Sequence, residues 1–151
     1  MNIQKFTQKS IEAVNGCEKI AMEYGNQEIE QEHLLYSLLQ VEDSLIRKLL
    51  EKMGVDTAAF ENRVRQALEK RTKVTGAKPY VGQYLNQVLT GAEDEAKALG
   101  DEYVSVEHLF LMLLKKPNRE VKEIFEEYGI TRSSFLEALR SVRGNRNVTS
   151  D

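Results

Sequence analysis

The chain repeats itself at one fixed spacing, and this repeat constrains its fold more than any other feature of the sequence. A shift of 75 residues aligns residues 6–68 with residues 81–143 without a gap. In this register the tripeptide Glu-His-Leu recurs at 32–34 and 107–109. Such self-similarity indicates two copies of one supersecondary unit, which we expect to pack on each other.

Each copy has the apolar periodicity of four helices. Within residues 7–24, apolar side chains recur at steps of three and four, which places them on one helical face. Only nine glycines and two prolines interrupt the 151 residues. We therefore expect an all-α fold of two tandem four-helix repeats related by a pseudo-twofold axis. In repeat one, the expected helices are 7–24, 31–41, one from Asp43 to Gly54, and one that begins at the N-cap Asp56. In repeat two, the first expected helix begins at Val81 and the second covers 106–116 with Ser105 as its N-cap. The third runs from Asn118 to Gly129, and the fourth begins at the N-cap Thr131.

Glycines indicate where the helices end. Gly25 and Gly100 follow the first helix of each copy, where a left-handed C′ residue is common. With Gly54 and Gly129 at C′, apolar residues fall at both C3 and C″, which is the pattern of a Schellman cap. The inward-facing residues expected on the fourth helices are Phe60, Val64, Ala67, Phe135, Leu139 and Val142.

We expect a single domain, 1–151. Its parts are repeat one (5–70), an exposed linker (71–79), repeat two (80–144) and a frayed polar tail (145–151). The linker contains threonine, glycine, proline and positive charge without a period. A cleft between the repeats, walled by the first helix of each, would suit an apolar peptide segment.

Composition and charge favour a cytoplasmic protein that binds neither nucleic acid nor membrane. The 21 Lys and Arg against 24 Asp and Glu give a net charge of −3, with no basic stripe interleaved with aromatics. The longest apolar run, 109–114, is far shorter than the roughly 18 residues of a membrane span. The N-terminus has no apolar segment of the kind found in signal peptides. A lone Cys17 suits a reducing compartment, and we expect it to pack in the core.

The chain carries no recognisable catalytic or metal-binding motif. Its only histidines, His33 and His108, occupy equivalent positions, but each helix offers one imidazole and not the pair of His-Glu-x-x-His. We interpret both as bonding locally in the first turn of a helix. Both have apolar neighbours in sequence, so we expect no Ser/His/Asp arrangement. A phosphate-binding loop is also absent from the sequence.

The charged motifs have ordinary structural interpretations. Glu32 and Glu107 lie in the first turn of a helix, where they complement the helix dipole. The alternative is that these two residues flank a ligand groove. We interpret the acidic run 93–95 and the mixed-charge run 69–71 as solvated surface.

Three motifs match a known family. They are Lys5–Phe6–Thr7, which opens the first copy, the run 29–39 with its Glu-His-Leu-Leu, and the run 100–109, Gly-Asp-Glu-Tyr-Val-Ser-Val-Glu-His-Leu, in the second copy. On these motifs the chain resembles, over essentially its whole length, the Clp N-terminal domain, the double repeat at the front of Clp-type AAA+ chaperones. Within that family it is most similar to the ClpB type, on residues 73–76, 101–109, 142–145 and 148–150.

The resemblance implies a substrate-binding domain and no enzyme activity for this part of the protein. The full protein would be a homohexameric disaggregase that acts with the DnaK system under stress. ATP and magnesium would bind in AAA+ modules after residue 151, and this part would hold no cofactor. The domain would capture unfolded or aggregated polypeptide and pass it to the ring.

The resemblance also implies a set of site residues. Three positions match family positions tied to chaperone activity. The family's apolar groove lies beside the first helix of the second repeat, but residues 91, 95 and 108 are not apolar in this sequence, so three other apolar residues are expected to form its wall. The resulting substrate-binding set is Thr7, Asp101 and Glu107, with Leu85, Val88 and Leu89 as the wall.

Two other functions are consistent with the sequence. A ClpC- or ClpA-type N-domain would bind adaptors or degradation tags for a protease, with Glu32 and Glu107 as an acidic ligand pair. A metal-dependent or thiol enzyme would use His33, His108 and Cys17. The sequence that follows this chain would separate a ClpC or ClpA type from the ClpB type. Metal analysis with thiol titration tests the metal-dependent or thiol enzyme.

Overall fold

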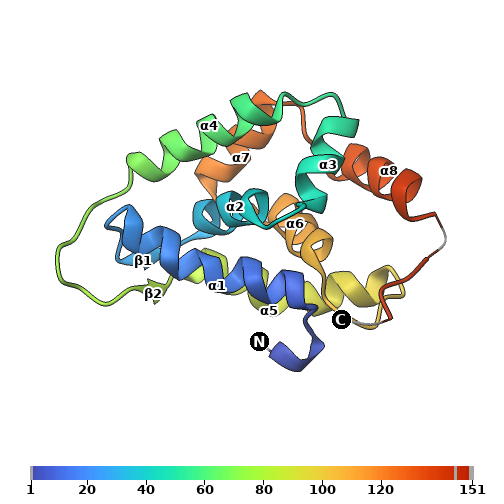
Figure 1. The fold of residues 1–151 in the computed structure, drawn as a ribbon, viewed down its shortest axis with the longest axis horizontal. Coiled ribbons are helices and arrows are strands. Elements are labelled where there is room, and N and C mark those ends of the chain that lie inside the picture. Colours follow the sequence, from blue (N-terminus) through green and yellow to red (C-terminus); the bar gives the residue numbers. More distant parts are fainter. Residues whose placement is uncertain (1, 145, 150–151) are drawn as a thin grey trace.

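The computed structural model describes residues 2–144 and 146–149, and this part of the chain folds into eight α-helices (Figure 1). Three further elements are small: a 3₁₀ helix at Ile3–Lys5, and two parallel paired strands, β1 (Glu28–Ile29) and β2 (Tyr80–Val81). The all-α prediction is confirmed. Repeat one contains α1 (Gln8–Glu23), α2 (Gln31–Gln40), α3 (Leu45–Lys52) and α4 (Thr57–Glu69); repeat two contains α5 (Gln83–Ala98), α6 (Val106–Lys115), α7 (Arg119–Glu127) and α8 (Arg132–Arg143).

Contacts between the repeats come in reciprocal pairs. Helix α1 packs on α6 as α5 packs on α2, and α3 packs on α8 as α7 packs on α4. Helices α2 and α6 meet each other at the centre, where Figure 1 shows them surrounded by the other helices. Reciprocity of this kind is the mark of a twofold arrangement. Both repeats contribute to one continuous core, with Phe60, Phe110 and Phe135 among its largest buried side chains.

The predicted helix ends are largely confirmed. The N–H of Val55 donates to the carbonyl of Leu50 at 2.9 Å, with Gly54 at a φ of 82°, which is the Schellman geometry. Repeat two repeats it around Gly129. One N-cap prediction is wrong, because α3 is capped by Ser44, whose hydroxyl accepts from the N–H of Arg47. The neighbouring residue, Asp43, has left-handed backbone geometry (φ 56°) and pairs with Lys48 instead.

Helix α5 is capped by a residue of the other repeat. Its own N-cap position is Gly82, and the buried Glu30 carboxylate accepts from the N–H groups of Tyr84 (3.1 Å) and Leu85 (3.0 Å). The same carboxylate accepts from the N–H of Gln31, so it caps α2 as well. A Cβ atom on Gly82 would lie 2.0 Å from a Glu30 oxygen, so only glycine leaves room for this cap. Burial raises the pKa of Glu30.

Three predictions of burial or exposure are wrong. Val142 is 43% exposed, because it lies in the last turn of α8 beyond the last buried residue of that helix. Glu95 is not solvated. It is 2% exposed and accepts two hydrogen bonds from Arg132, at 2.9 and 2.7 Å. Arg71 is likewise not a solvated charge, because it donates to Glu28 and Glu32.

The segments after α4 and α8 are bound to the body of the protein. Lys73 forms an antiparallel bridge with Asn26, and the N–H of Val74 donates to the carbonyl of Gly25 at 2.9 Å. The tail was expected to be frayed, but the N–H of Val148 donates to Asp101 at 2.8 Å. Residues 145 and 150–151 of that expected tail lie outside the described residues. Equivalent segments therefore fold back on equivalent loops in the two repeats.

Candidate functional site

An apolar opening of about 260 Å³ lies where the two repeats meet, and two of the predicted site residues line it. It is bordered by the N-termini of α1, α3 and α6 and by the C-terminus of α2. Thr7 and Glu107 lie on its rim. Its apolar lining consists of Leu38, Val41, Leu45 and Val106, and its other lining residues are Lys9, Asp43, Ser44 and Ser105. We call this opening the Thr7 pocket.

Thr7 is held in place by both repeats. It is the N-cap of α1, and its hydroxyl oxygen accepts from the N–H of Ser10 at 3.2 Å. Its own N–H donates to the carbonyl of Val104, in repeat two, at 2.9 Å, and the Ser10 hydroxyl reaches the same carbonyl. The rim of the Thr7 pocket is therefore rigid.

Glu107 and Asp101 are joined by one arginine. Arg143 donates to Asp101 at 2.7 Å and to Glu107 at 3.2 Å, and the second Glu107 oxygen accepts from the Ser105 hydroxyl. Asp101 is buried behind Glu107 and does not line the pocket. Burial by itself would raise the pKa of Asp101, but hydrogen bonds from the Val148 N–H, His108 and Arg143 outweigh it and hold the pKa below its usual range. Asp101 therefore supports Glu107 through Arg143.

Ser105, His108 and Asp101 lie in contact, contrary to the expectation that the chain has no Ser/His/Asp arrangement. The His108 ring donates from Nε2 to Asp101 at 2.6 Å, and its Nδ1 lies 3.2 Å from the Ser105 hydroxyl oxygen. However, Nδ1 already accepts the backbone N–H of Ser105 at 2.8 Å, and the Ser105 hydroxyl donates to Glu107. The serine is therefore not activated as a nucleophile, because its proton and the base point to other partners. Burial lowers the pKa of His108 and keeps its ring neutral.

His33 makes the same local contacts in repeat one. Its Nδ1 accepts the N–H of Glu30 at 2.9 Å, and its Nε2 donates to Asn26 at 2.9 Å. Burial, reinforced by the charge of Arg71, lowers the pKa of His33 to about 4. The prediction that each histidine bonds locally in the first turn of a helix is confirmed.

The counterpart of the Thr7 pocket in the other half of the molecule is filled. At the position equivalent to Val106 stands Gln31, whose amide donates to the carbonyls of Tyr84 (3.1 Å) and Lys116 (2.9 Å). Its side-chain oxygen accepts the N–H of Asn118 at 2.8 Å. Val106 is shorter and apolar, so the equivalent space beside α1 stays open. The two halves thus share a backbone and differ in whether this space is occupied.

The predicted apolar wall is not accessible. Leu85, Val88 and Leu89 are 2%, 0% and 8% exposed, because this face of α5 packs into the core. We correct the prediction that they line a substrate groove.

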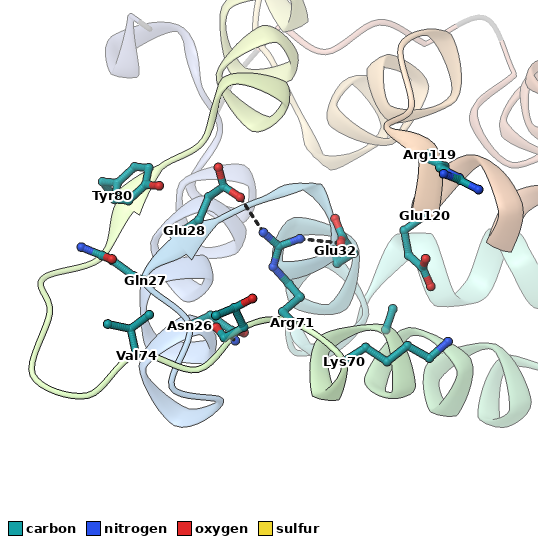
Figure 2. A pocket seen from close by; sticks show the side chains of 12 residues that line it. Asn26, Gln27, Glu28, Glu32, Lys70, Arg71, Val74, Tyr80, Arg119 and Glu120 are labelled. Carbon is teal, nitrogen blue, oxygen red and sulfur yellow. Dashed lines mark hydrogen bonds and ion pairs between the residues drawn. The ribbon is translucent and has the colours of Figure 1, made fainter.

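A cavity of about 580 Å³ is lined mainly by charged and polar residues (Figure 2). Arg71 lies between Glu28 and Glu32 and donates to them at 2.8 and 2.7 Å. Arg119 and Glu120 lie across the cavity on α7. Glu32 and Glu107 therefore line different openings, and each is paired with its own arginine.

The remaining candidate residues do not form a reactive site. Within residues 2–144 and 146–149, no group of His, Cys, Asp and Glu side chains is placed to hold a metal ion. Cys17 is buried as predicted, and burial raises the pKa of its thiol to about 12. Over the same residues, the helices include none with the length and apolar character that crossing a bilayer requires.

Comparison with known proteins gives consistent matches. A family model described as the Clp repeat (R) N-terminal domain matches residues 5–128. The chaperone protein ClpB of Nitratidesulfovibrio vulgaris is 41% identical over 99% of this chain and 18% of its own length. ClpB of Bacillus anthracis is 34% identical with the same coverage. The chain thus spans less than a fifth of the curated relatives it matches.

Solved structures match in fold. The Hsp104 N-terminal domain of Candida albicans has a TM-score of 0.82 at 23% identity, covering 97% of this chain and 96% of its own. A ClpV N-domain, solved in complex with a VipB peptide, has a TM-score of 0.73 at 22% identity, covering 97% of this chain and 92% of its own. At these identities the likeness supports the fold alone.

Proposed function

This chain belongs to the Clp repeat N-terminal domain family, and on that basis we propose that it is the substrate-binding domain of a ClpB-type chaperone. It captures unfolded or aggregated polypeptide and delivers it to the rest of the protein. The full protein is then a homohexamer that uses ATP and magnesium in modules outside this chain and cooperates with the DnaK system.

The Thr7 pocket is the observation that carries the proposal. It combines a rigid polar rim with an apolar lining, and its volume suits one large apolar side chain of a bound segment. Burial of one such side chain contributes about 1.5–3 kcal/mol, so a single domain binds weakly. Weak, non-specific capture suits a chaperone, because several copies in one ring raise the overall affinity through multivalency.

The structure gives less support to an acidic ligand pair of the kind expected for adaptors or degradation tags. Glu32 and Glu107 line separate openings, and their carboxylates are occupied by Arg71 and Arg143. A ligand that used both residues would have to displace two arginines at different places. We infer that the domain binds without catalysis, since the neutral His108 and the Ser105 hydroxyl are both engaged in capping contacts.

The experiment fills the Thr7 pocket with the side chain that fills its counterpart. Val106→Gln should place an amide in the pocket, as Gln31 does in the other half. Val142→Gln is the matched control, since it is the same substitution at an exposed position. Binding of a permanently unfolded model protein is measured by fluorescence anisotropy, with circular dichroism to establish that each variant is folded.

We expect V106Q to weaken binding about tenfold or more, because the buried apolar contact is lost. V142Q should bind like the wild type. A folded V106Q with unchanged affinity would place the binding surface elsewhere, and a wild-type domain that binds no unfolded protein would refute the proposed function itself.

A further inference from the structure

A second opening continues from the Thr7 pocket along repeat one. It has a volume of about 520 Å³, lies between α1 and α2, and shares Val41 with the Thr7 pocket. Its lining residues are Glu12, Gly16, Lys19, Ile20, Glu23, Tyr36, Ser37, Gln40, Val41 and Glu42. We call it the α1–α2 groove. Helix α1 is 16 residues long, so the two openings together follow about 24 Å of helix.

Comparison of the two repeats shows why the α1–α2 groove is open in repeat one. In both repeats a glycine lets the first two helices approach closely: a Cβ atom on Gly16 would lie 2.5 Å from the Ser37 hydroxyl, and one on Gly91 would lie 2.7 Å from the end of Met112. Met112 and Ser37 occupy equivalent positions. Met112 lies over Gly91 and fills the seam, whereas the Ser37 hydroxyl turns to the carbonyl of Ala13 at 2.6 Å and leaves it empty.

A second difference between the repeats also leaves the groove open in repeat one. The position of Ile20 in repeat one is occupied in repeat two by Glu95, which is bound to Arg132. The seam of repeat two is therefore closed by a methionine side chain and bordered by a buried ion pair. In repeat one, Ile20 and Val41 present apolar surface to the opening instead.

The rim of the α1–α2 groove is acidic. Glu12, Glu23 and Glu42 line it together with one cation, Lys19. Among the described residues, none of these three carboxylates has an ion-pair partner within 4.0 Å. The charges of the groove are therefore free to meet a bound segment, and their sign favours a basic one.

We propose that the α1–α2 groove extends the Thr7 pocket into an elongated site that selects segments in which apolar residues are flanked by lysine or arginine. This inference rests on the proposed function, and it specifies the substrate class. An extended segment of about seven residues spans 24 Å at roughly 3.3 Å per residue. Apolar side chains would enter the Thr7 pocket and the groove floor, and basic side chains would face the rim.

The first test uses two peptides with the same apolar core, one flanked by lysines and one by glutamates. We expect the lysine peptide to bind more tightly, and its advantage to shrink at high salt because the rim charges are exposed. The double variant E12Q/E23Q removes two exposed charges and should weaken the lysine peptide about twofold to thirtyfold, at 0.2–1 kcal/mol per exposed pair. Glu18→Gln is the control, since Glu18 is exposed on α1 but does not line the groove.

The second test closes the groove. Ser37→Met places in repeat one the side chain that Met112 provides in repeat two, and it should weaken the lysine peptide about tenfold. Equal binding of the two peptides, or unchanged binding by a folded S37M, would overturn the inference. If V106Q lost peptide binding while S37M and E12Q/E23Q kept it, the Thr7 pocket and the proposed function would stand and the groove would be rejected. If S37M does not fold, E12Q/E23Q decides.

Discussion

Protonation of His33 should make the stability of the domain depend strongly on pH. The His33 ring is fully buried and the charge of Arg71 lies nearby, so its pKa falls from an ordinary value of 6.5 to about 4. A group with a depressed histidine pKa binds fewer protons when folded than when unfolded between those two values. The stability contributed by neutral His33 is therefore complete above pH 6.5 and is lost as the pH falls towards 4.

The magnitude follows from the two pKa values. Between pH 7 and pH 5 the linkage relation gives a loss of about 2 kcal/mol in the free energy of unfolding. Urea denaturation followed by circular dichroism at both pH values measures it. The reference is His33→Gln, because glutamine also suits the third position of a capping box and does not titrate.

Comparison of the wild type with H33Q isolates the effect of His33. His108 and all the carboxylates are present in both proteins, so their titration largely cancels in the difference between the wild type and H33Q. We expect the wild type to lose about 2 kcal/mol more than H33Q on going from pH 7 to pH 5. An equal loss in both would refute the argument that the buried ring is held neutral.

Two further predictions concern the contacts that join the helices. Glu30→Ala removes the carboxylate that caps both α2 and α5, and it should lower the free energy of unfolding by about 2 kcal/mol or more. Gly82→Ser should also destabilise the domain, because its Cβ would meet Glu30. Urea denaturation measures both, and a gain in stability from either variant would contradict the shared cap. Arg132→Ala leaves the buried Glu95 with only the more distant Lys115, at 4.0 Å, and should cost about 3 kcal/mol. Glu95→Leu should change stability by less than about 1 kcal/mol, because the Arg132 side chain is 38% exposed and can rehydrate; equal losses in the two variants would show that burial does not set the asymmetry.

Several features of the fold depend on residues close together in the chain, and these were predictable. The Schellman caps at Gly54 and Gly129 need only a glycine and two apolar residues within one turn. Asn118 caps α7 through a hydrogen bond to a residue three positions away. The histidines bond to their own helix starts for the same reason. The all-α class and the duplication follow from the periodicity of apolar residues along the chain.

Burial was harder to predict, because it depends on what the other repeat places against a helix. Glu95 has the local sequence of a solvated helix face, but Arg132 from α8 reaches it. Leu85 has the apolar character expected of a groove wall, and it is covered by the core. Ser44 and Asp43 are both good N-cap types, and the local sequence does not choose between them; the backbone turn that leads into α3 does.

The sequence by itself therefore determined the helices, most of their ends and the repeat, and through the family resemblance it named Thr7 and Glu107. Only the tertiary structure decided that these two residues border the same pocket and that Asp101 lies behind it. The physical reason is the twofold packing of unlike copies. Gln31 fills a space that Val106 leaves open, and Met112 fills a seam that Ser37 leaves open, and neither difference has a meaning until the two repeats are brought together.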